Sequence, residues 1–473
     1  MTTPLAGAAS AQFAGTAPAQ FAGTAPAQFA GTAVAQLEAD GVATVVGTVV
    51  NPAGLTHAKT VPIRRTNAFA DPGLGASPVW HGFVIDRAGI AFAEGISVVG
   101  DERVRIDLEA LRPIGDGLAW APGAFFDQDG NPIPSCARGT LARIESRLAA
   151  AGLQALVGHE IEFLLVDPEG NRLPGNLWAQ YGLAGVLEHE GFVRDVTEAA
   201  TAAGVGIEQL HPEYGLNQFE VSLTPRSPVA AADQLVLARI LISRVARDYG
   251  MRVSLSPVPF AGSVGSGAHQ HFSLERGDTP VFSGGSGAQG MTPDAEAAIG
   301  GIVAGLPEAQ LIFCGSIVSG LRMQPGNWAG AYACWGTENR EAAVRFLRAG
   351  PGNPYGANVE VKVVDPSANP YFATAAILGL ALDGIERSAP LPPETPVDPG
   401  TLSEQERKAA GIVALSADQS VAIPALDGSS RMRAILGDAA VNVLVAVRRY
   451  EHETYSHLDP EQLTDKFRMA WSL

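Results

Sequence analysis

The sequence predicts an α+β protein in which a small sheet-rich domain precedes a larger domain of antiparallel strands backed by helices. Its 473 residues exceed what a single hydrophobic core usually holds, so at least two domains are expected. Short β-branched segments dominate the first part of the chain, and segments of helical periodicity dominate the remainder. The order of these segments fits antiparallel strands with helices better than a regular βαβ repeat.

The chain is predicted to begin with a disordered tail at residues 1–34. Residues 11–33 read AQFAGTAP, AQFAGTAP, AQFAGTAV, and three such copies are too short to stack into a solenoid. Their Gly, Ala and Pro content favours a mobile segment without a packed core. The repeat is interpreted as sequence expansion, and a self-association or partner motif stays open because each copy carries one Phe.

Residues 35–135 are predicted to form the sheet-rich domain. The apolar, β-branched stretch GVATVVGTVV at 41–50 is followed by turn residues and a second short strand at about 60–63. Short strands continue through residues 79–108. The turn-rich sequence DGNPIPSCAR at 129–138 places the domain boundary after residue 135.

Residues 136–473 are predicted to form the larger domain, which opens with a helix in TLARIESRLAAAGL. Strands are expected at 156–166, 218–223, 251–256 and 270–274. Helices are expected at 178–191, 228–249, 292–313, 367–387 and 431–451. The Pro-rich sequence PLPPETPVDPG after residue 389 predicts an extended loop.

Composition excludes several classes of function. The net charge of −17 argues against a nucleic-acid partner, because binding phosphates requires clusters of basic residues. Neither a signal peptide nor an apolar run of membrane-spanning length is evident, so no membrane association is expected. Cys136, Cys314 and Cys334 are widely spaced, which is typical of reduced cysteines in a cytoplasmic protein.

Three strand-like segments carry polar groups at alternate positions. The segments are VGHEIEFLLVD with Glu160 and Glu162, GSGAHQHFSL with His269 and His271, and NVEVKVVD with Glu360 and Lys362. Residues two apart on a strand point to the same face. Burying acids or imidazoles there is costly unless a metal or polar ligand meets them. The three pairs therefore predict one site.

The candidate ligands are rich in oxygen and include no thiolate. They are Glu160, Glu162, Glu213, Glu220, His269 and Glu360. Such a set selects Mg²⁺ or Mn²⁺ over zinc. Without metal, crowded carboxylates would raise one another's pKa values, whereas two divalent ions would relieve the repulsion and leave positions for phosphate oxygens. For any single Glu, a solvated surface position remains the alternative.

Several motifs, taken in order, resemble the glutamine synthetase family. They are GHEIEFLL, HPEYGLNQFEVSLTP, GSGAHQHFSL, RMQPG, CWGTENREAAVRF and NVEVKVVDPSANPYFATAAILGLALDGIE. The resemblance covers about residues 36–390 and is to class I, prokaryotic-type members. It implies an N-terminal β-grasp domain and a C-terminal catalytic domain of antiparallel strands with helices. It also implies a homo-oligomeric dodecamer of two hexameric rings, with active sites between neighbouring subunits.

The resemblance also implies roles for individual residues. One metal is expected at Glu162, Glu213 and Glu220, and the second at Glu160, His269 and Glu360. Nucleotide contacts are expected from His271 and Ser273. Contacts to glutamate are expected from Arg322, at the α-carboxylate, and from the backbone of Gly265. Catalytic contacts around the transferred phosphate are expected from Arg340 and Arg345.

The implied reaction uses ATP and two or more Mg²⁺ or Mn²⁺ ions. Glutamate is activated as γ-glutamyl phosphate, and an amine then attacks to give an amide. Metals and arginines stabilise the developing charge.

Two departures from the family concern the amine. Asn51 in VVNPAG and Trp328 in QPGNWAG stand where ammonia-using members carry an aspartate and a glutamate that bind ammonium and remove its proton. Ammonia is therefore expected to be a poor substrate, and Trp328 offers a flat apolar face to a larger amine. A weakly basic aromatic amine would need no base, and aliphatic amines stay possible if another residue takes the proton.

Three further departures concern the acid and the nucleotide. Val264 replaces an asparagine that touches the amino acid, Lys362 replaces an arginine near its carboxylate, and Asn358 replaces an arginine at the nucleotide phosphates. Lys is not equivalent to Arg for bidentate recognition, so the acid could differ from glutamate, although Arg322 predicts a carboxylate.

Two functions therefore remain open. The leading prediction is an ATP-dependent carboxylate-amine ligase that forms a γ-glutamylamide from an amine other than ammonia. The alternative is a catalytically weak homologue that binds nucleotide or amino acid, or serves as a structural assembly.

Overall fold

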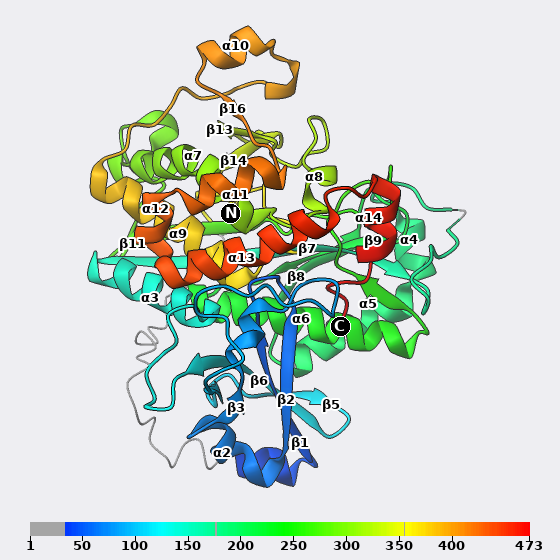
Figure 1. Cartoon of the computed structure of the whole chain (residues 1–473). Coiled ribbons are helices and arrows are strands. Elements are labelled where there is room, and N and C mark those ends of the chain that lie inside the picture. The colour runs from blue at the N-terminus through cyan, green and yellow to red at the C-terminus, as the bar shows by residue number, and fades with distance from the viewer. Residues whose placement is uncertain (1–33, 176, 354) are drawn as a thin grey trace, which may run out of the picture.

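The computed structural model describes residues 34–175, 177–353 and 355–473, and Figure 1 shows the whole chain. The octapeptide repeats, and with them nearly all of the predicted tail at 1–34, lie outside the described residues. The described chain starts with a helical segment at residues 34–39, in which Val34 and Leu37 pack on the N-terminal core.

The N-terminal part is built on a six-stranded sheet of order β2-β1-β6-β4-β3, with β5 paired to β6. Its strands are β1 (Thr44–Val50), β2 (Thr56–Pro62), β3 (Leu74–Ala76), β4 (Glu102–Ile106), β5 (Arg112–Gly115) and β6 (Leu118–Phe126). The central pair β1 and β6 is parallel, and the other pairs are antiparallel. The short helix α2 (Thr66–Ala70) contributes the fully buried Phe69 to this core.

The larger part is built on a ten-stranded sheet of order β16-β13-β14-β15-β11-β7-β9-β8, with β10 paired to β7 and β12 to β11. The strands are β7 (Leu153–Val166), β8 (Ile207–Pro212), β9 (Gln218–Leu223), β10 (Arg252–Ser254), β11 (Gln270–Arg276), β12 (Thr279–Pro280), β13 (Tyr332–Thr337), β14 (Ala342–Leu347), β15 (Asn358–Val361) and β16 (Val413–Ala414). Among these, β13 and β14 alone pair in parallel.

Helices cover this sheet (Figure 1). They are α3 (Ala137–Ala150), α4 (Leu183–Glu188), α5 (Glu190–Ala202), α6 (Pro228–Asp248), α7 (Pro293–Phe313), α8 (Ser319–Arg322), α9 (Pro370–Arg387), α10 (Glu404–Ala409), α11 (Gln419–Asp427), α12 (Ser430–Leu436), α13 (Asp438–Tyr455) and α14 (Pro460–Phe467). The predicted α+β class, with mainly antiparallel strands and helices, is therefore confirmed.

Two predicted helices are interrupted in the structure. The segment 178–191 does not begin as a helix until Leu183, because Tyr181 adopts a left-handed backbone with φ 55°. The segment 431–451 divides at Gly437, whose φ of 91° lies outside the helical range. Both breaks depend on local backbone geometry that apolar periodicity does not reveal.

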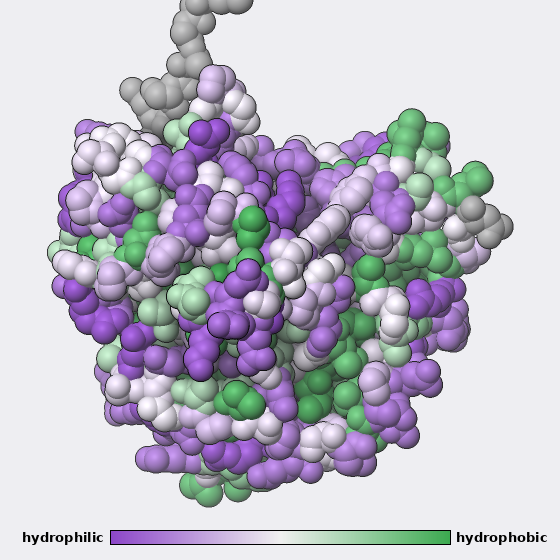
Figure 2. All heavy atoms as spheres, turned by 90° about the horizontal axis from the view of Figure 1, so that it is seen from above, coloured by the Kyte–Doolittle hydropathy of each residue, from purple (hydrophilic) through white to green (hydrophobic). Residues whose placement is uncertain are grey.

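Within the described chain, α7 is the one helix long and apolar enough to cross a membrane, and 72% of its most apolar window is buried inside the protein. Such burial is typical of a core helix, since α7 packs against α9. The three cysteines are free and buried, as expected of ordinary core residues. In the view from above, hydrophilic residues cover much of the face and hydrophobic residues gather toward its right side (Figure 2).

The buried side chain of Arg138 links the two parts of the molecule through Asp107. Arg138 at the start of α3 donates to Asp233 of α6 at 2.9 and 2.8 Å and to Asp107, beside β4, at 2.7 Å. Tyr371 also donates to Asp233, at 2.8 Å. The predicted boundary after residue 135 lies between the end of β6 and the start of α3, and it stays a prediction.

We expect Arg138→Leu to lower the free energy of unfolding by about 3–5 kcal/mol, because Asp233 would stay buried without its cation. Denaturant titration followed by circular dichroism measures this loss. Arg147→Leu is the matched control on the same helix, since its pair with Glu386 spans 3.7 Å and both side chains are largely exposed. That control should cost no more than about 1 kcal/mol, and equal losses in the two variants would contradict the expectation.

Candidate functional site

A single cavity of about 1230 Å³ collects the predicted site residues. All of the predicted residues except Asn51 line it: Glu160, Glu162, Glu213, Glu220, Val264, Gly265, His269, His271, Ser273, Arg322, Trp328, Arg340, Arg345, Asn358, Glu360 and Lys362. These residues come from segments far apart in the sequence. The fold therefore produces the convergence that the alternating polar pairs predict.

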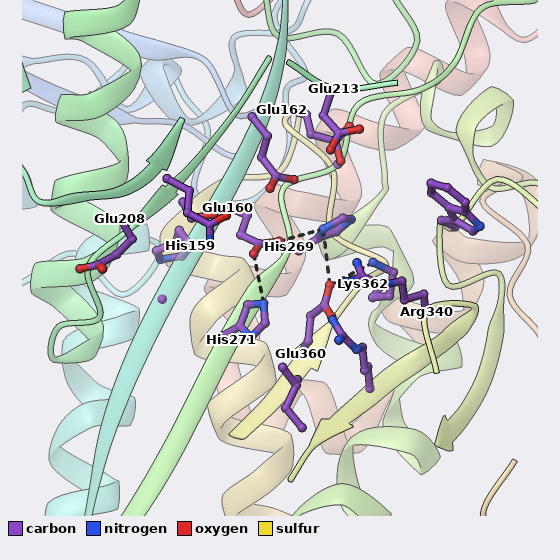
Figure 3. Close-up of a pocket in the computed structure, with 18 of the residues that line it drawn as sticks. His159, Glu160, Glu162, Glu208, Glu213, His269, His271, Arg340, Glu360 and Lys362 are labelled. Carbon is purple, nitrogen blue, oxygen red and sulfur yellow. Dashed lines mark hydrogen bonds and ion pairs between the residues drawn. The ribbon is translucent and has the colours of Figure 1, made fainter. Parts of the chain in front are cut away.

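Strand register explains how the acids come together. Glu162 on β7 lies directly opposite Glu220 on β9, and His271 on β11 lies opposite Glu360 on β15. The alternate residues Ile161 and Phe163 are fully buried on the other side, because successive side chains on a strand point to opposite faces. Figure 3 shows Glu160, His269, His271 and Glu360 turned toward one another, whereas Glu208 lies apart from them.

The backbone near the cluster has little room for side chains. A Cβ placed on Gly267 would lie 2.5 Å from His269 Nε2 and 3.0 Å from Glu162 Oε1. Both distances are shorter than normal contacts, so a side chain here would displace groups of the site. Gly267 thus permits the close approach of strand and loop.

One half of the cluster is dominated by carboxylates. Glu220 is 8% exposed, and burial together with the charge of Glu160 raises its pKa to about 8. Burial and the charge of Glu162 also raise the pKa of Glu213. These shifts show that the carboxylates repel one another in a poorly solvated place, where a cation would be stabilising.

In the other half of the cluster, imidazole groups lie beside the carboxylates and compensate their negative charge. His269 Nδ1 lies 3.3 Å from Glu160 Oε2 and 3.5 Å from Glu360 Oε1, and His271 Nε2 lies 3.5 Å from Glu160 Oε1. Burial alone would raise the pKa of Glu160, but the two imidazoles hold it well below its usual value. Burial likewise opposes the charge on His271, yet Glu160 and Glu360 raise its pKa to about 9.

Three groups of side chains could hold a metal ion, each with ligand atoms within 4.8 Å of one another. They are Glu160 with His271 and Glu360, Glu160 with Glu220 and His269, and His211 with Glu213 and Glu220. The set is rich in oxygen and suits Mg²⁺ or Mn²⁺. The groupings differ from the two predicted triplets: Glu162 belongs to none of them, and its carboxylate accepts a hydrogen bond from Gln218 at 3.0 Å.

His211 also belongs to the cluster, although it is not among the residues predicted from the sequence. His211 Nε2 lies 3.3 Å from Glu220 Oε1, and β8 places it opposite Glu220. The hydrogen bond with Glu220 raises the pKa of His211. Its position two residues before Glu213 repeats the alternation that identified the other pairs, so the signal was present.

Cations border the acid cluster on the side of Glu360. Glu360 accepts from Lys362 Nζ at 3.0 Å through one oxygen and from Arg345 at 3.0 Å through the other, so both oxygens already face cations. Arg322 is 4% exposed and is held by the carbonyl oxygens of Lys362 and Val363 at 3.1 and 3.2 Å. Arg340 lies exposed on the cavity lining. This distribution suits an anionic substrate beside a divalent cation.

The predicted nucleotide contacts lie along β11 and β15. His271 Nδ1 is hydrogen-bonded to Asn358 Oδ1 at 2.9 Å, which orients the ring toward Glu160. Ser273 also lines the cavity, as do Tyr355 and Glu208, whose side chains are hydrogen-bonded to each other.

Trp328 and Val264 also line the cavity, and their places on the amine and acid sides stay predictions. The Trp328 side chain is 46% exposed, and its backbone N–H donates to Glu341 Oε1 at 3.1 Å. Its ring lies 6.0 Å from that of Tyr214, with the two planes at 87°. The rings of Trp328 and Tyr214 therefore border the cavity. Trp328 stands at the position where ammonia-using members of the family are expected to carry an acid.

Asn51 does not reach the cavity of its own chain. It is 1% exposed; its Nδ2 donates to Phe83 O at 2.8 Å, and its Oδ1 accepts from the backbone N–H groups of Ala53 and Leu55, both at 3.0 Å. Within one chain, Asn51 thus stabilises the turn between β1 and β2. Its predicted contact with the amine of a neighbouring subunit stays a prediction.

We expect Glu220→Gln to weaken Mn²⁺ binding by about tenfold or more. The same change should raise the melting temperature of the metal-free protein near neutral pH, because Glu220, whose pKa is raised to about 8 in the fold, must take up a proton on folding and Gln need not. Electron paramagnetic resonance of free Mn²⁺ and thermal unfolding with and without Mg²⁺ measure the two effects. Glu208→Gln is the matched control, since Glu208 lines the same cavity outside the three groups; equal loss of Mn²⁺ binding there would contradict the assignment.

We expect Asn51→Asp to destabilise the fold by about 1–3 kcal/mol rather than create an ammonium site. The substitution would replace the donor to Phe83 O with a carboxylate oxygen and leave two oxygens facing each other in a buried place. Urea denaturation measures the loss of stability. Unchanged stability accompanied by a gain of ammonium-dependent ADP release would contradict this expectation.

Comparisons with known proteins agree with this geometry. Residues 134–465 match the family described as glutamine synthetase, catalytic domain. The chain is 36% identical over 438 residues to the gamma-glutamylpolyamine synthetase GlnA3 of Streptomyces coelicolor, covering 91% of this chain and 94% of that protein. It is 31% identical to the glutamine synthetase of Pyrococcus abyssi, covering 72% of this chain and 76% of the relative.

A solved structure described as a novel glutamine synthase homolog superimposes with a TM-score of 0.81 at 28% identity, covering 91% of this chain and 99% of that one. The matched family region includes every strand and loop that contributes a carboxylate or imidazole to the cavity. The chain therefore belongs to the glutamine synthetase family.

Proposed function

We propose that the protein is an ATP-dependent glutamate-amine ligase that forms a γ-glutamylamide from an amine other than ammonia. The observation that carries the proposal is the combination in one cavity of an intact acid and imidazole cluster with Trp328 at the place of an acid. The first supports activation of a carboxylate by ATP, and the second argues against ammonium as the nitrogen donor. The relative GlnA3, named as a polyamine enzyme, supports a larger amine.

In the proposed reaction, the γ-phosphoryl group of ATP is transferred to the side-chain carboxylate of glutamate. The amine nitrogen then forms a bond to the activated carbon, the bond from that carbon to the phosphate oxygen breaks, and the nitrogen releases one proton. Mg²⁺ or Mn²⁺ held by the acid cluster would neutralise charge on the phosphates. Arg322 would bind the α-carboxylate, and Arg340 and Arg345 would stabilise the transferred phosphate.

We also propose the finer features that the family resemblance implies. These are two or more metal ions per site, contacts from Gly265, Val264 and Lys362 to the acid, and contacts from His271, Ser273 and Asn358 to the nucleotide. They further include a cytoplasmic dodecamer of two hexameric rings. In such an assembly a neighbouring subunit would bring the segment around Asn51 to the amine side.

A second function is favoured by one observation. Lys362 and Arg345 occupy the two oxygens of Glu360, so a divalent ion would have to compete with resident cations for this ligand. A catalytically weak homologue that binds nucleotide or amino acid would tolerate such pairing. Release of ADP that requires both an acid and an amine distinguishes the ligase from this alternative.

We expect the purified protein with ATP, Mg²⁺ and glutamate to release ADP with primary amines larger than ammonia and at least about tenfold more slowly with ammonium. The reason is that the cavity offers Trp328 instead of a carboxylate that removes the ammonium proton. A coupled ADP assay over a panel of amines measures this, and mass spectrometry identifies the amide. Fast turnover with ammonium would refute the amine specificity, and no release with any amine would favour the weak homologue.

A further inference from the structure

Four exposed aromatic residues line the cavity, and one of them, Tyr355, is hydrogen-bonded to Glu208. The other three lie next to one another or next to the acid cluster. Tyr181, Tyr214 and Trp328 are 51%, 45% and 46% exposed, and all three line the cavity. We call these residues the aromatic rim. Tyr214 and Trp328 meet edge to face, and the Tyr181 ring lies 6.2 Å from that of His211, next to the acid cluster. The rim therefore places aromatic faces beside carboxylates.

The backbone holds two of these residues in an unfavourable conformation. Tyr181 has φ 55° and Trp328 has φ 52°, and bulky side chains are rare in this left-handed region. Such a conformation is found preferentially at functional sites. No other aromatic residue of the described chain has a positive φ. Both exceptions thus belong to the rim of the same cavity.

The charge around the rim favours a cation. The Tyr181 hydroxyl group is hydrogen-bonded to Glu213 and lies close to Glu162 and Glu220, so carboxylates surround this end of the rim. Aromatic faces also attract ammonium groups within about 6 Å of the ring. The rim thus suits an alkylammonium better than a neutral aromatic ring.

We propose that the aromatic rim binds the distal, protonated nitrogen of an aliphatic diamine or polyamine while its other nitrogen attacks the activated acid. The inference rests on the proposed function and specifies the amine as one that carries two or more nitrogen atoms. It assigns Trp328 and Tyr214 as residues that determine specificity, and it gives the exposed rings a role that ammonia could not use.

The test compares two amines of equal size. 1,5-Diaminopentane and hexylamine have the same number of non-hydrogen atoms, and only the first carries a second ammonium group. We expect the wild-type protein to show kcat/KM about five- to tenfold higher for the diamine, as one cation–π contact would produce. Trp328→Leu should abolish this preference, Trp328→Phe should keep most of it, and the KM for glutamate should not change.

Two further variants complete the design. Tyr214→Leu should reduce the preference as well, and it provides a second rim variant if Trp328→Leu does not fold. Tyr249→Leu is the control for loss of an exposed aromatic side chain, since Tyr249 is 41% exposed and does not line the cavity. It should leave the ratio of the two amines unchanged.

Failure of this inference differs from failure of the proposed function. ADP release at equal kcat/KM for both amines, or a preference for aniline, would overturn the rim assignment and leave the ligase intact. No ADP release with any amine would overturn the ligase. In that case, calorimetric titration with 1,5-diaminopentane still tests the rim, because binding needs no turnover: equal affinity of wild type and Trp328→Leu would overturn it.

Discussion

The site depends on the repulsion among carboxylates that the sheet holds together in a poorly solvated place. Glu162 on β7 lies opposite Glu220 on β9. Carboxylate oxygens of Glu160 lie within 4.8 Å of those of Glu220 and of Glu360 on β15. Their strands cannot separate to relieve the repulsion, because the alternate residues are anchored in the core on the opposite face. The free energy of packing therefore maintains an arrangement that is unfavourable without a cation.

The negative charge of the carboxylates is compensated to different extents in the two halves of the cluster. Around Glu160 and Glu360, resident imidazoles, Lys362 and Arg345 supply positive charge, so these acids stay ionised. Around Glu213 and Glu220, compensation is weaker, and burial raises their pKa values. A divalent ion would therefore be stabilised most in the second half, whereas in the first half it must replace existing ion pairs.

Alternation along strands made much of the site predictable, because period-two spacing fixes which side chains share a face. Glu160 and Glu162 on β7, and Glu360 on β15, follow this rule. The parallel pairing of β13 with β14 and the left-handed backbone of Tyr181 do not, since both depend on contacts made after the chain folds. The sequence also does not predict that Asn51 lies outside the cavity of its own chain. Four hydrogen bonds fix its side chain, and its sequence position does not reveal them.

The absence of an acid at position 328 and the presence of the aromatic rim suit the same substrate, a diamine. An alkylammonium with a pKa near about 10 is almost entirely protonated at neutral pH, so without a base few molecules can attack. In a diamine, the charge on one nitrogen disfavours protonation of the other, which lowers the pKa of the reacting end. A rim that stabilises the distal ammonium would keep that charge in place while the other nitrogen is neutral. The substrate would then supply part of the deprotonation that an acidic residue provides for ammonium.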